Sequence, residues 1–168
     1  MENLYSLWVV PPPEISDLLQ KLITNLSSKY NSPSFEPHMT LLGNISSDKK
    51  PMLEKANTLV SKLKPLPLSL SEISFSTTYF QSVFVRVKAT AELMNANLIA
   101  KDIYQTDNSV FMPHISLIYG NHSMEERGKI VSEVILPKNI TFNAEEIIVI
   151  PSTQNPNEWT HLAELQLL

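Results

Sequence analysis

The feature of this sequence that most constrains its fold is a short pattern that occurs twice. Residues 37–43 read Pro-His-Met-Thr-Leu-Leu-Gly, and residues 113–120 read Pro-His-Ile-Ser-Leu-Ile-Tyr-Gly. Each copy is an apolar run that starts after a proline and ends at a glycine, which is typical of a short buried strand. A strand-like segment and a helical segment precede each copy, and another helical segment follows it. This self-similarity predicts two duplicated halves, roughly residues 1–66 and 67–168, that face each other across a pseudo-two-fold axis.

The spacing of the apolar residues predicts the individual elements. β-Forming runs predict strands over residues 4–10, 36–43, 83–88, 112–120, 140–150 and 159–167, with a further extended region over 68–80. Helical spacing predicts helices over residues 15–26, 52–63, 91–104 and 124–134. The first helix is expected to start at the prolines of residues 11–13, and the second to be capped by Ser47 or Asp48.

The composition limits the classes of protein to be considered. The chain has 168 residues, 43% of them hydrophobic and 18% charged, as expected for a single globular domain over residues 1–168. A net charge of -4 argues against a stable complex with nucleic acid. Cysteine is absent, which excludes disulfides, thiol catalysis and zinc–thiolate sites. The N-terminal residues lack the features of a signal peptide, and no apolar run approaches the roughly 18 residues of a membrane span. We therefore expect a cytoplasmic monomer without a membrane partner.

Each copy of the repeated pattern places an imidazole beside a hydroxyl. Side chains alternate across a strand, so His38 and Thr40 share one face of their strand, and His114 and Ser116 share one face of theirs. If the halves pack symmetrically, two imidazoles and two hydroxyls converge on one cleft. A single His-x-Ser/Thr motif is weak, because a lone histidine in a strand is usually structural. Two copies in the same context favour a functional site.

These four side chains suit the hydrolysis of a phosphodiester. One histidine can take a proton from water while the other, protonated, gives one to the leaving oxygen, because the ordinary imidazole pKa of about 6.5 permits both roles. The hydroxyls can donate hydrogen bonds to non-bridging phosphoryl oxygens. The scheme needs no metal and no cofactor, and the sequence has no motif with metal-ligand spacing. We therefore predict a metal-independent phosphodiesterase with His38, Thr40, His114 and Ser116 as its catalytic residues.

The paired motifs resemble those of the 2H phosphoesterase superfamily, and within it the plant and yeast cyclic phosphodiesterases. The resemblance spans nearly the whole chain, and its main stretches are residues 5–8, 35–40, 80–84 and 112–119. It implies an α+β, bilobal, LigT-like fold, in which two pseudo-symmetric lobes with antiparallel sheets surround a central cleft and the helices lie outside. Plant relatives carry cysteines and this chain has none, so no redox-linked feature is carried over.

The same resemblance implies an activity on small cyclic phosphate nucleotides, which are by-products of RNA and tRNA splicing. The reactions are hydrolysis of ADP-ribose 1″,2″-cyclic phosphate to ADP-ribose 1″-phosphate and of nucleoside 2′,3′-cyclic phosphates to 2′-phosphates. By analogy with the family, His114 activates water and His38 protonates the leaving oxygen. The resemblance also implies that Trp8, Phe80 and Tyr119 border the base. From the residues alone, Trp8 suits a core position equally well. Tyr119 can reach the cleft only if its strand bends or ends near residue 118, because its parity is opposite to that of His114.

Two alternative functions stay open. The same four residues could process RNA ends or 2′-5′ phosphodiesters, although the acidic charge balance speaks against the basic groove that an RNA enzyme would use. The chain could also bind a nucleotide without turnover, although both motifs are intact. Outside the motifs, we expect His122 in a loop, His161 on a strand and Arg86 at the surface, with a contact to the phosphate as the alternative for Arg86.

Overall fold

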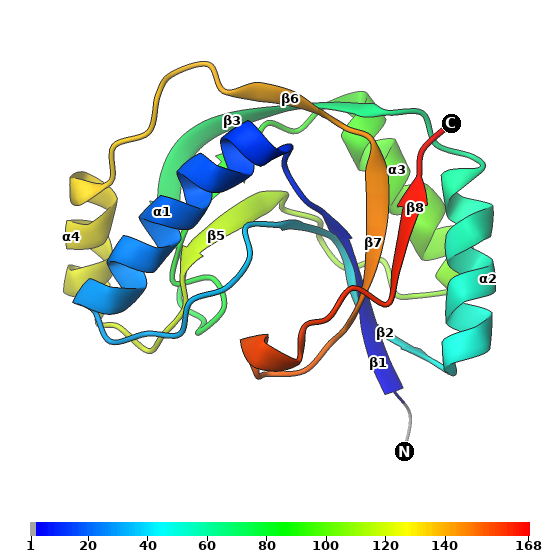
Figure 1. Cartoon of the computed structure of the whole chain (residues 1–168), viewed down its shortest axis with the longest axis horizontal. Helices are drawn as coiled ribbons and strands as arrows, with labels where there is room; N and C mark the ends of the chain where they lie inside the picture. The colour runs from blue at the N-terminus through cyan, green and yellow to red at the C-terminus, as the bar shows by residue number, and fades with distance from the viewer. Residues whose placement is uncertain (1–2) are drawn as a thin grey trace.

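The computed structural model describes residues 3–168, in which eight strands form one antiparallel sheet (Figure 1). The strands are β1 Asn3–Val9, β2 Met39–Ser47, β3 Leu66–Phe75, β4 Val83–Val87, β5 His114–Ile118, β6 Thr141–Ala144, β7 Glu146–Pro151 and β8 Ala163–Gln166. Their order across the sheet is β6-β3-β4-β5-β2-β1-β7-β8. At the centre, β2 and β5 share a single pair of residues, Met39 opposite Ile115. The sheet therefore divides into two four-stranded halves, which meet at the two Pro-His patterns.

The helices cover both halves from outside. They are α1 Pro13–Lys29, α2 Lys49–Val60, α3 Ala91–Tyr104 and α4 Met124–Glu133, and a short 3-10 helix spans Pro156–Glu158. Helices α1 and α4 contact the half that contains β3, β4 and β5. Helix α2 contacts β7 and β8 of the other half, and α3 lies mainly against β2 but also reaches β3 (Figure 1). Each half of the sheet is thus completed by elements from both ends of the chain. The division of the chain into two duplicated halves, residues 1–66 and 67–168, stays a prediction from the sequence.

The alternation predicted for the two central strands is present in the structure. Met39 and Leu41 of β2, and Ile115 and Leu117 of β5, are fully buried in the main hydrophobic core. These side chains have the parity opposite to that of the predicted catalytic residues. Because the apolar side chains are buried against the helices, the polar side chains that alternate with them point to the other face of the sheet.

The termini of the helices agree with the sequence in most places. Helix α1 begins at Pro13, as predicted, because a proline in the first turn loses no intrahelical hydrogen bond. Helix α2 begins after Asp48, but the Asp48 side chain makes no capping hydrogen bond. At the start of α4, the Ser123 hydroxyl accepts from the backbone N–H of Glu126, and the Glu126 carboxylate accepts from the N–H of Ser123, both at 3.1 Å. This capping box fixes the first turn of α4.

Three predicted strands differ from the structure. The strand predicted over residues 36–43 is β2, which starts at Met39 and continues past Gly43 to Ser47. The segment predicted as one strand over residues 140–150 forms β6, which pairs with β3, and β7, which pairs with β1 in the other half. The chain crosses between the halves at Glu145, and periodicity within one segment cannot reveal which partner each part finds. The last predicted strand, 159–167, is reduced to β8, because residues 159–162 form a loop that follows the 3-10 helix. His161 lies in that loop, so its predicted place on a strand is wrong.

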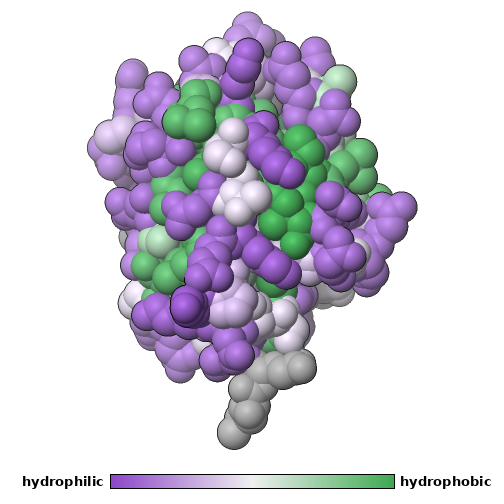
Figure 2. Space-filling view, turned by 90° about the vertical axis from the view of Figure 1, so that its right-hand side faces the viewer, coloured by the Kyte–Doolittle hydropathy of each residue, from purple (hydrophilic) through white to green (hydrophobic). Residues whose placement is uncertain are grey.

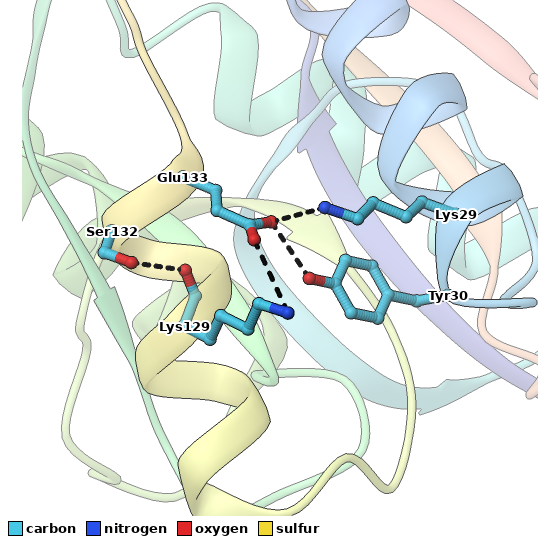
Figure 3. A network of polar contacts seen from close by, with 5 residues as sticks. All are labelled: Lys29, Tyr30, Lys129, Ser132 and Glu133. Atoms are coloured by element: carbon cyan, nitrogen blue, oxygen red, sulfur yellow. Dashed lines mark hydrogen bonds and ion pairs between the residues drawn. The ribbon is translucent and has the colours of Figure 1, made fainter.

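A polar network joins α1 to α4 on the outer surface (Figure 3). The ammonium of Lys29 donates to Glu133 Oε2 at 2.8 Å, and the Tyr30 hydroxyl donates to the same oxygen at 3.0 Å. Lys129 lies 3.9 Å from the other carboxylate oxygen of Glu133. The network ties the end of α1, and the segment that leads from it to His38, to the half of the sheet that carries His114.

The outer face over α2 is mostly hydrophilic, and its hydrophobic side chains lie in separate groups (Figure 2). Met52, Ala56 and Leu59 of α2 are fully buried, since this face of the helix packs against the sheet. Within residues 3–168, none of the helices combines the length and the apolar character needed to cross a bilayer.

Candidate active site

A cavity of about 690 Å³ opens where the two halves of the sheet meet. All seven residues that the sequence singled out line this cavity: Trp8, His38, Thr40, Phe80, His114, Ser116 and Tyr119. His38 directly precedes β2, Thr40 is its second residue, and His114 and Ser116 lie on β5. The two Pro-His patterns therefore meet in one cleft.

The two imidazoles are held in the same way. Nδ1 of His38 lies 2.7 Å from the carbonyl oxygen of Glu36, and Nδ1 of His114 lies 2.8 Å from that of Met112. A carbonyl oxygen only accepts, so Nδ1 carries the proton and donates in each ring. In the neutral ring, Nε2 is then left as a proton acceptor. Each contact spans one proline, Pro37 or Pro113, whose fixed φ shapes the turn before the histidine.

Burial keeps both histidines neutral in the free protein. His38 is only 8% exposed, and this burial lowers its pKa from 6.5 to about 4; the Glu36 carbonyl acts in the opposite direction, and the charge of His114 lowers the pKa further. Burial also lowers the pKa of His114, against the effect of the Met112 carbonyl and with a contribution from the guanidinium of Arg86. Near pH 7 the cleft therefore presents two unprotonated Nε2 atoms.

The two hydroxyls differ in their partners. The Ser116 hydroxyl is buried and donates to the carbonyl oxygen of Phe80 at 2.9 Å. Thr40 is half-buried, and in the described part of the chain its hydroxyl has no hydrogen-bond partner. Thr40 can therefore donate directly to a ligand, whereas Ser116 must first exchange its bond to Phe80.

The Trp8 indole packs on a predicted catalytic side chain. Trp8 is 3% exposed; its ring stacks on that of His38, and it also packs in a small apolar cluster with Ile148 and Ile150. Trp159 lies edge-on to both rings, with centroids 5.5 Å from Trp8 and 5.9 Å from His38. Trp159 was not predicted from the sequence, because it lies in the loop before β8 and reaches the cleft only through the tertiary fold.

The opposite wall carries Tyr119 and Phe80. Strand β5 ends at Ile118, which is the condition under which Tyr119 was predicted to reach the cleft. Tyr119 stacks on Phe35 with centroids 3.8 Å apart, and Phe80 meets its ring edge-on at 5.0 Å. Burial raises the pKa of the Tyr119 hydroxyl well above its ordinary value, although the neighbouring Ser116 hydroxyl opposes this shift. The Tyr119 hydroxyl therefore stays neutral throughout the physiological range.

The turn after Tyr119 requires a glycine. Gly120 has φ of +149°, and a Cβ on it would lie 2.3 Å from Cε1 of His122. His122 lies in the loop after β5, as predicted, and its ring contacts the hydroxyls of Ser82 at 3.0 Å and Ser32 at 3.3 Å. His122 thus has a structural place outside the lining of the cleft.

A buried arginine that sequence analysis missed supports the Phe80–Tyr119 wall. Arg127 of α4 donates only to backbone carbonyls, those of Ser76, Thr78, Gly120 and His122. These carbonyls belong to the two loops that carry Phe80 and Tyr119. The side chain of Arg127 therefore holds one loop against the other.

Two further charged groups lie at the margin of the site. Arg86, predicted at the surface, is partly exposed; it lies opposite His114 in the β4–β5 pair and 3.3 Å from a carboxylate oxygen of Glu72. His161 lies 2.8 Å from a carboxylate oxygen of Glu36 and 2.6 Å from one of Glu164. Although partial burial acts to lower it, these carboxylates raise the pKa of His161 overall. In residues 3–168 there is no cluster of three or more side chains suited to hold a metal ion.

The model of the cyclic phosphodiesterase-like protein family matches residues 4–167 of this chain. A cyclic phosphodiesterase of Arabidopsis thaliana is 30% identical over 130 residues, which are 75% of this chain and 70% of that protein. A 2′,3′-cyclic-nucleotide 3′-phosphodiesterase of Yarrowia lipolytica is 30% identical over 141 residues, covering 77% of this chain and 62% of that protein.

Solved structures share the fold at low identity. Protein TT0787 of Thermus thermophilus has a TM-score of 0.66 at 17% identity, covering 98% of this chain and 97% of that one. E. coli LigT in complex with 3′-AMP has a TM-score of 0.66 at 13% identity, covering 99% of each chain. At these identities the likeness concerns the fold, and it confirms the predicted α+β, LigT-like architecture.

Proposed function

The chain belongs to the cyclic phosphodiesterase-like protein family, and from this premise we propose that it hydrolyses ADP-ribose 1″,2″-cyclic phosphate and nucleoside 2′,3′-cyclic phosphates in the cleft described above. The observation that carries the proposal is the matched pair His38 and His114. Each has its Nδ1 held by a backbone carbonyl, each is two residues from a hydroxyl, and both line one cavity. A general base and a general acid on opposite sides of one phosphate need this arrangement.

In the proposed reaction, His114 Nε2 takes a proton from a water molecule as its oxygen bonds to phosphorus. The bond from phosphorus to the 2″-oxygen, or to the 3′-oxygen in a nucleoside cyclic phosphate, breaks, and protonated His38 gives its proton to that oxygen. The product is the 1″-phosphate or the 2′-phosphate. The cycle closes when His114 loses its proton to solvent and His38 gains one.

The low pKa of His38 is compatible with the role of acid. His38 is neutral in the free protein at neutral pH because it is buried. A bound phosphodiester brings a negative charge beside the imidazole, and an opposite charge nearby favours the protonated form. We expect His38 to gain its proton together with the substrate and then to be a strong acid toward the leaving oxygen.

The hydroxyls are proposed to bind the two non-bridging oxygens. Thr40 can donate to one of them without losing another bond, and Ser116 can donate to the other by turning away from the Phe80 carbonyl. Negative charge on these oxygens builds up in the transition state, so the two hydrogen bonds strengthen during the reaction.

The charges around the cleft favour a small substrate over RNA. Among the described residues that line the cavity, Lys101 is the only lysine or arginine. A groove that follows an RNA backbone would need several such cations. Cytoplasmic location and the monomeric state stay predictions from the sequence.

The test is a product analysis by ³¹P NMR with three substrates side by side: ADP-ribose 1″,2″-cyclic phosphate, a nucleoside 2′,3′-cyclic phosphate and a short RNA that ends in a 2′,3′-cyclic phosphate. The control is the protein with both His38→Ala and His114→Ala. We expect the 1″-phosphate and the 2′-phosphate from the small substrates. A preference for the oligomer would instead indicate an RNA-processing enzyme, and binding without product would indicate a nucleotide-binding module.

A further inference from the structure

The cleft extends beyond the histidine pair because the sheet is split at its centre. Strands β2 and β5 share only the pair Met39–Ile115. The lining of the same cavity includes residues 41–44 of β2, residues 109–112 before β5, and two polar side chains of α3, Asn97 and Lys101. The cavity therefore reaches from the proposed catalytic residues to helix α3.

Lys101 brings an unpaired positive charge to this end of the cleft. Its side chain is about 8% exposed, and its ammonium donates one hydrogen bond, to the backbone carbonyl of Ser109. Within residues 3–168, no carboxylate oxygen lies within 4.0 Å of this ammonium, since it takes part in none of the ion pairs. An ammonium has three donors, and a buried charge is costly unless an opposite charge accompanies it. The position of Lys101 therefore suits an anion that enters the cleft.

Asn97 fixes the place of Lys101 in the cleft wall. It lies one turn earlier on α3 and donates from Nδ2 to the carbonyl oxygen of Leu41 at 2.8 Å. Leu41 follows the catalytic candidate Thr40, so this bond ties α3 to the part of β2 that carries the site. The distance from Lys101 to the histidine pair is thus set by packed secondary structure.

We propose that Lys101 forms a second anion-binding subsite, which receives a phosphoryl group of the substrate other than the cyclic one. This inference rests on the proposed function. A cavity of about 690 Å³ falls within the range of sites that enclose a whole ligand of nucleotide size. The subsite gives the protein a preference for substrates that carry a diphosphate or a terminal phosphate beside their cyclic phosphate.

A matched pair of substrates tests the subsite: adenosine 2′,3′-cyclic phosphate with a free 5′-hydroxyl, and the same compound with a 5′-phosphate. ADP-ribose 1″,2″-cyclic phosphate is the third substrate. For Lys101→Met, we expect KM to rise about tenfold or more for the two substrates with additional phosphates, and to change less than about twofold for the 5′-hydroxyl compound, because only the former lose a charge-assisted contact. In Lys101→Arg, the ratio between the KM for the 5′-hydroxyl compound and the KM for each substrate with additional phosphates should stay as in the wild type.

The competing explanation is that Lys101 only anchors the segment at Ser109, which leads into His114. In that case Lys101→Met would change the kinetic constants equally for all three substrates, and this result would overturn the proposal. Lys129→Met, which removes an exposed lysine of α4, is the control and should leave every ratio unchanged. The Arg variant also reports on folding, since it keeps the positive charge at this position.

A binding measurement separates this proposal from the proposed function. If the wild-type protein hydrolysed none of the three substrates, the proposed function would fail and calorimetric titration with inorganic pyrophosphate would decide on the subsite. Binding to the wild type that weakens about tenfold or more in Lys101→Met supports the subsite. Equal binding to both proteins, or no binding to the wild type, refutes it.

Discussion

The indole of Trp8 lies flat against the imidazole of His38, with ring centroids 3.5 Å apart and planes 7° from parallel. The resemblance implies that Trp8 borders the base of the substrate; in the structure Trp8 lines the cavity, and one face of its ring is covered by His38. We therefore propose that Trp8 is a positioning residue, which fixes the plane of the imidazole and contributes to its burial.

Replacing Trp8 by Leu should raise the pKa of His38 from about 4 toward its ordinary value, because burial is the largest cause of the lowered pKa and a smaller side chain admits water. NMR titration of the His38 ring protons measures this change. Trp159→Leu is the control, since Trp159 contacts the His38 ring only edge-on, and it should shift the pKa less. A His38 pKa that is the same in Trp8→Leu as in the wild type would refute the role of Trp8.

Replacing either His38 or His114 by Ala should lower kcat at least about 100-fold, the usual effect of losing a general acid or base. Steady-state kinetics with a 2′,3′-cyclic nucleotide measures the loss. His122→Gln removes an imidazole that lies outside the cleft and should leave kcat within a few-fold of the wild type. Wild-type turnover by either alanine variant would rule out the proposed pair.

The same alanine variants distinguish the acid from the base. A phosphodiester with a p-nitrophenyl leaving group needs little protonation of the leaving oxygen, so the loss of the acid should matter less with this substrate. If His38 is the acid, His38→Ala should lose less kcat with the aryl ester than with the cyclic nucleotide, whereas His114→Ala should lose a similar factor with both substrates. The reverse pattern would exchange the two roles.

The pH dependence of kcat/KM should differ from that of kcat. In the free protein, His38 loses its proton as the pH rises through about 4, so kcat/KM should fall across the range above that value. In the complex, the bound phosphate raises the pKa of His38, and the alkaline limb of kcat should lie at higher pH. Rates measured from pH 4 to 9 give the acidic and alkaline limbs of each profile. The apparent pKa values of these limbs belong to the pair of His38 and His114 together. Flat or identical profiles would contradict paired acid–base catalysis.

Stability should fall as the solution is acidified from pH 6.5 to pH 4. Between the ordinary pKa of 6.5 and the native pKa of about 4, the unfolded chain binds a proton at His38 that the native state excludes. The free energy of unfolding should therefore decrease by about 1.4 kcal/mol per pH unit in this window from this residue. Urea denaturation measures the dependence of the free energy of unfolding on pH, and His38→Gln should reduce this dependence.

The raised pKa of His161 acts in the opposite sense, since its stabilising contribution is present below pH 6.5 and is lost as the pH rises through the raised value. An unchanged slope in His38→Gln would contradict the burial argument.

Removal of divalent cations should leave the activity intact, because the proposed reaction uses only imidazoles and hydroxyls. The measurement compares kcat/KM after dialysis against EDTA with kcat/KM after addition of Mg²⁺, Mn²⁺ or Zn²⁺. Activity that disappears with EDTA and returns with one of these ions would refute the proposed mechanism.

The sequence was most informative where local rules decide the outcome. The start of α1 at Pro13 follows from the chemistry of proline in the first turn of a helix. The alternation along β2 and β5 follows from the period of a strand, so the parity of His38, Thr40, His114 and Ser116 was predictable. The meeting of the two motifs was predictable because the same pattern occurs twice.

Only the tertiary structure decided which elements from different parts of the chain meet. It pairs β6 with β3 in one half of the sheet and β7 with β1 in the other, and it brings Trp159 and Lys101 into the cleft. It also stacks Trp8 on His38 and buries this histidine, and the burial lowers the pKa of the imidazole. Burial and pKa depend on contacts between residues that lie far apart in the chain, and no pattern within one segment encodes them. The sequence by itself therefore determined the chemical groups of the site, and the packing of the two halves of the sheet determined their charge, their orientation and the reach of the cleft.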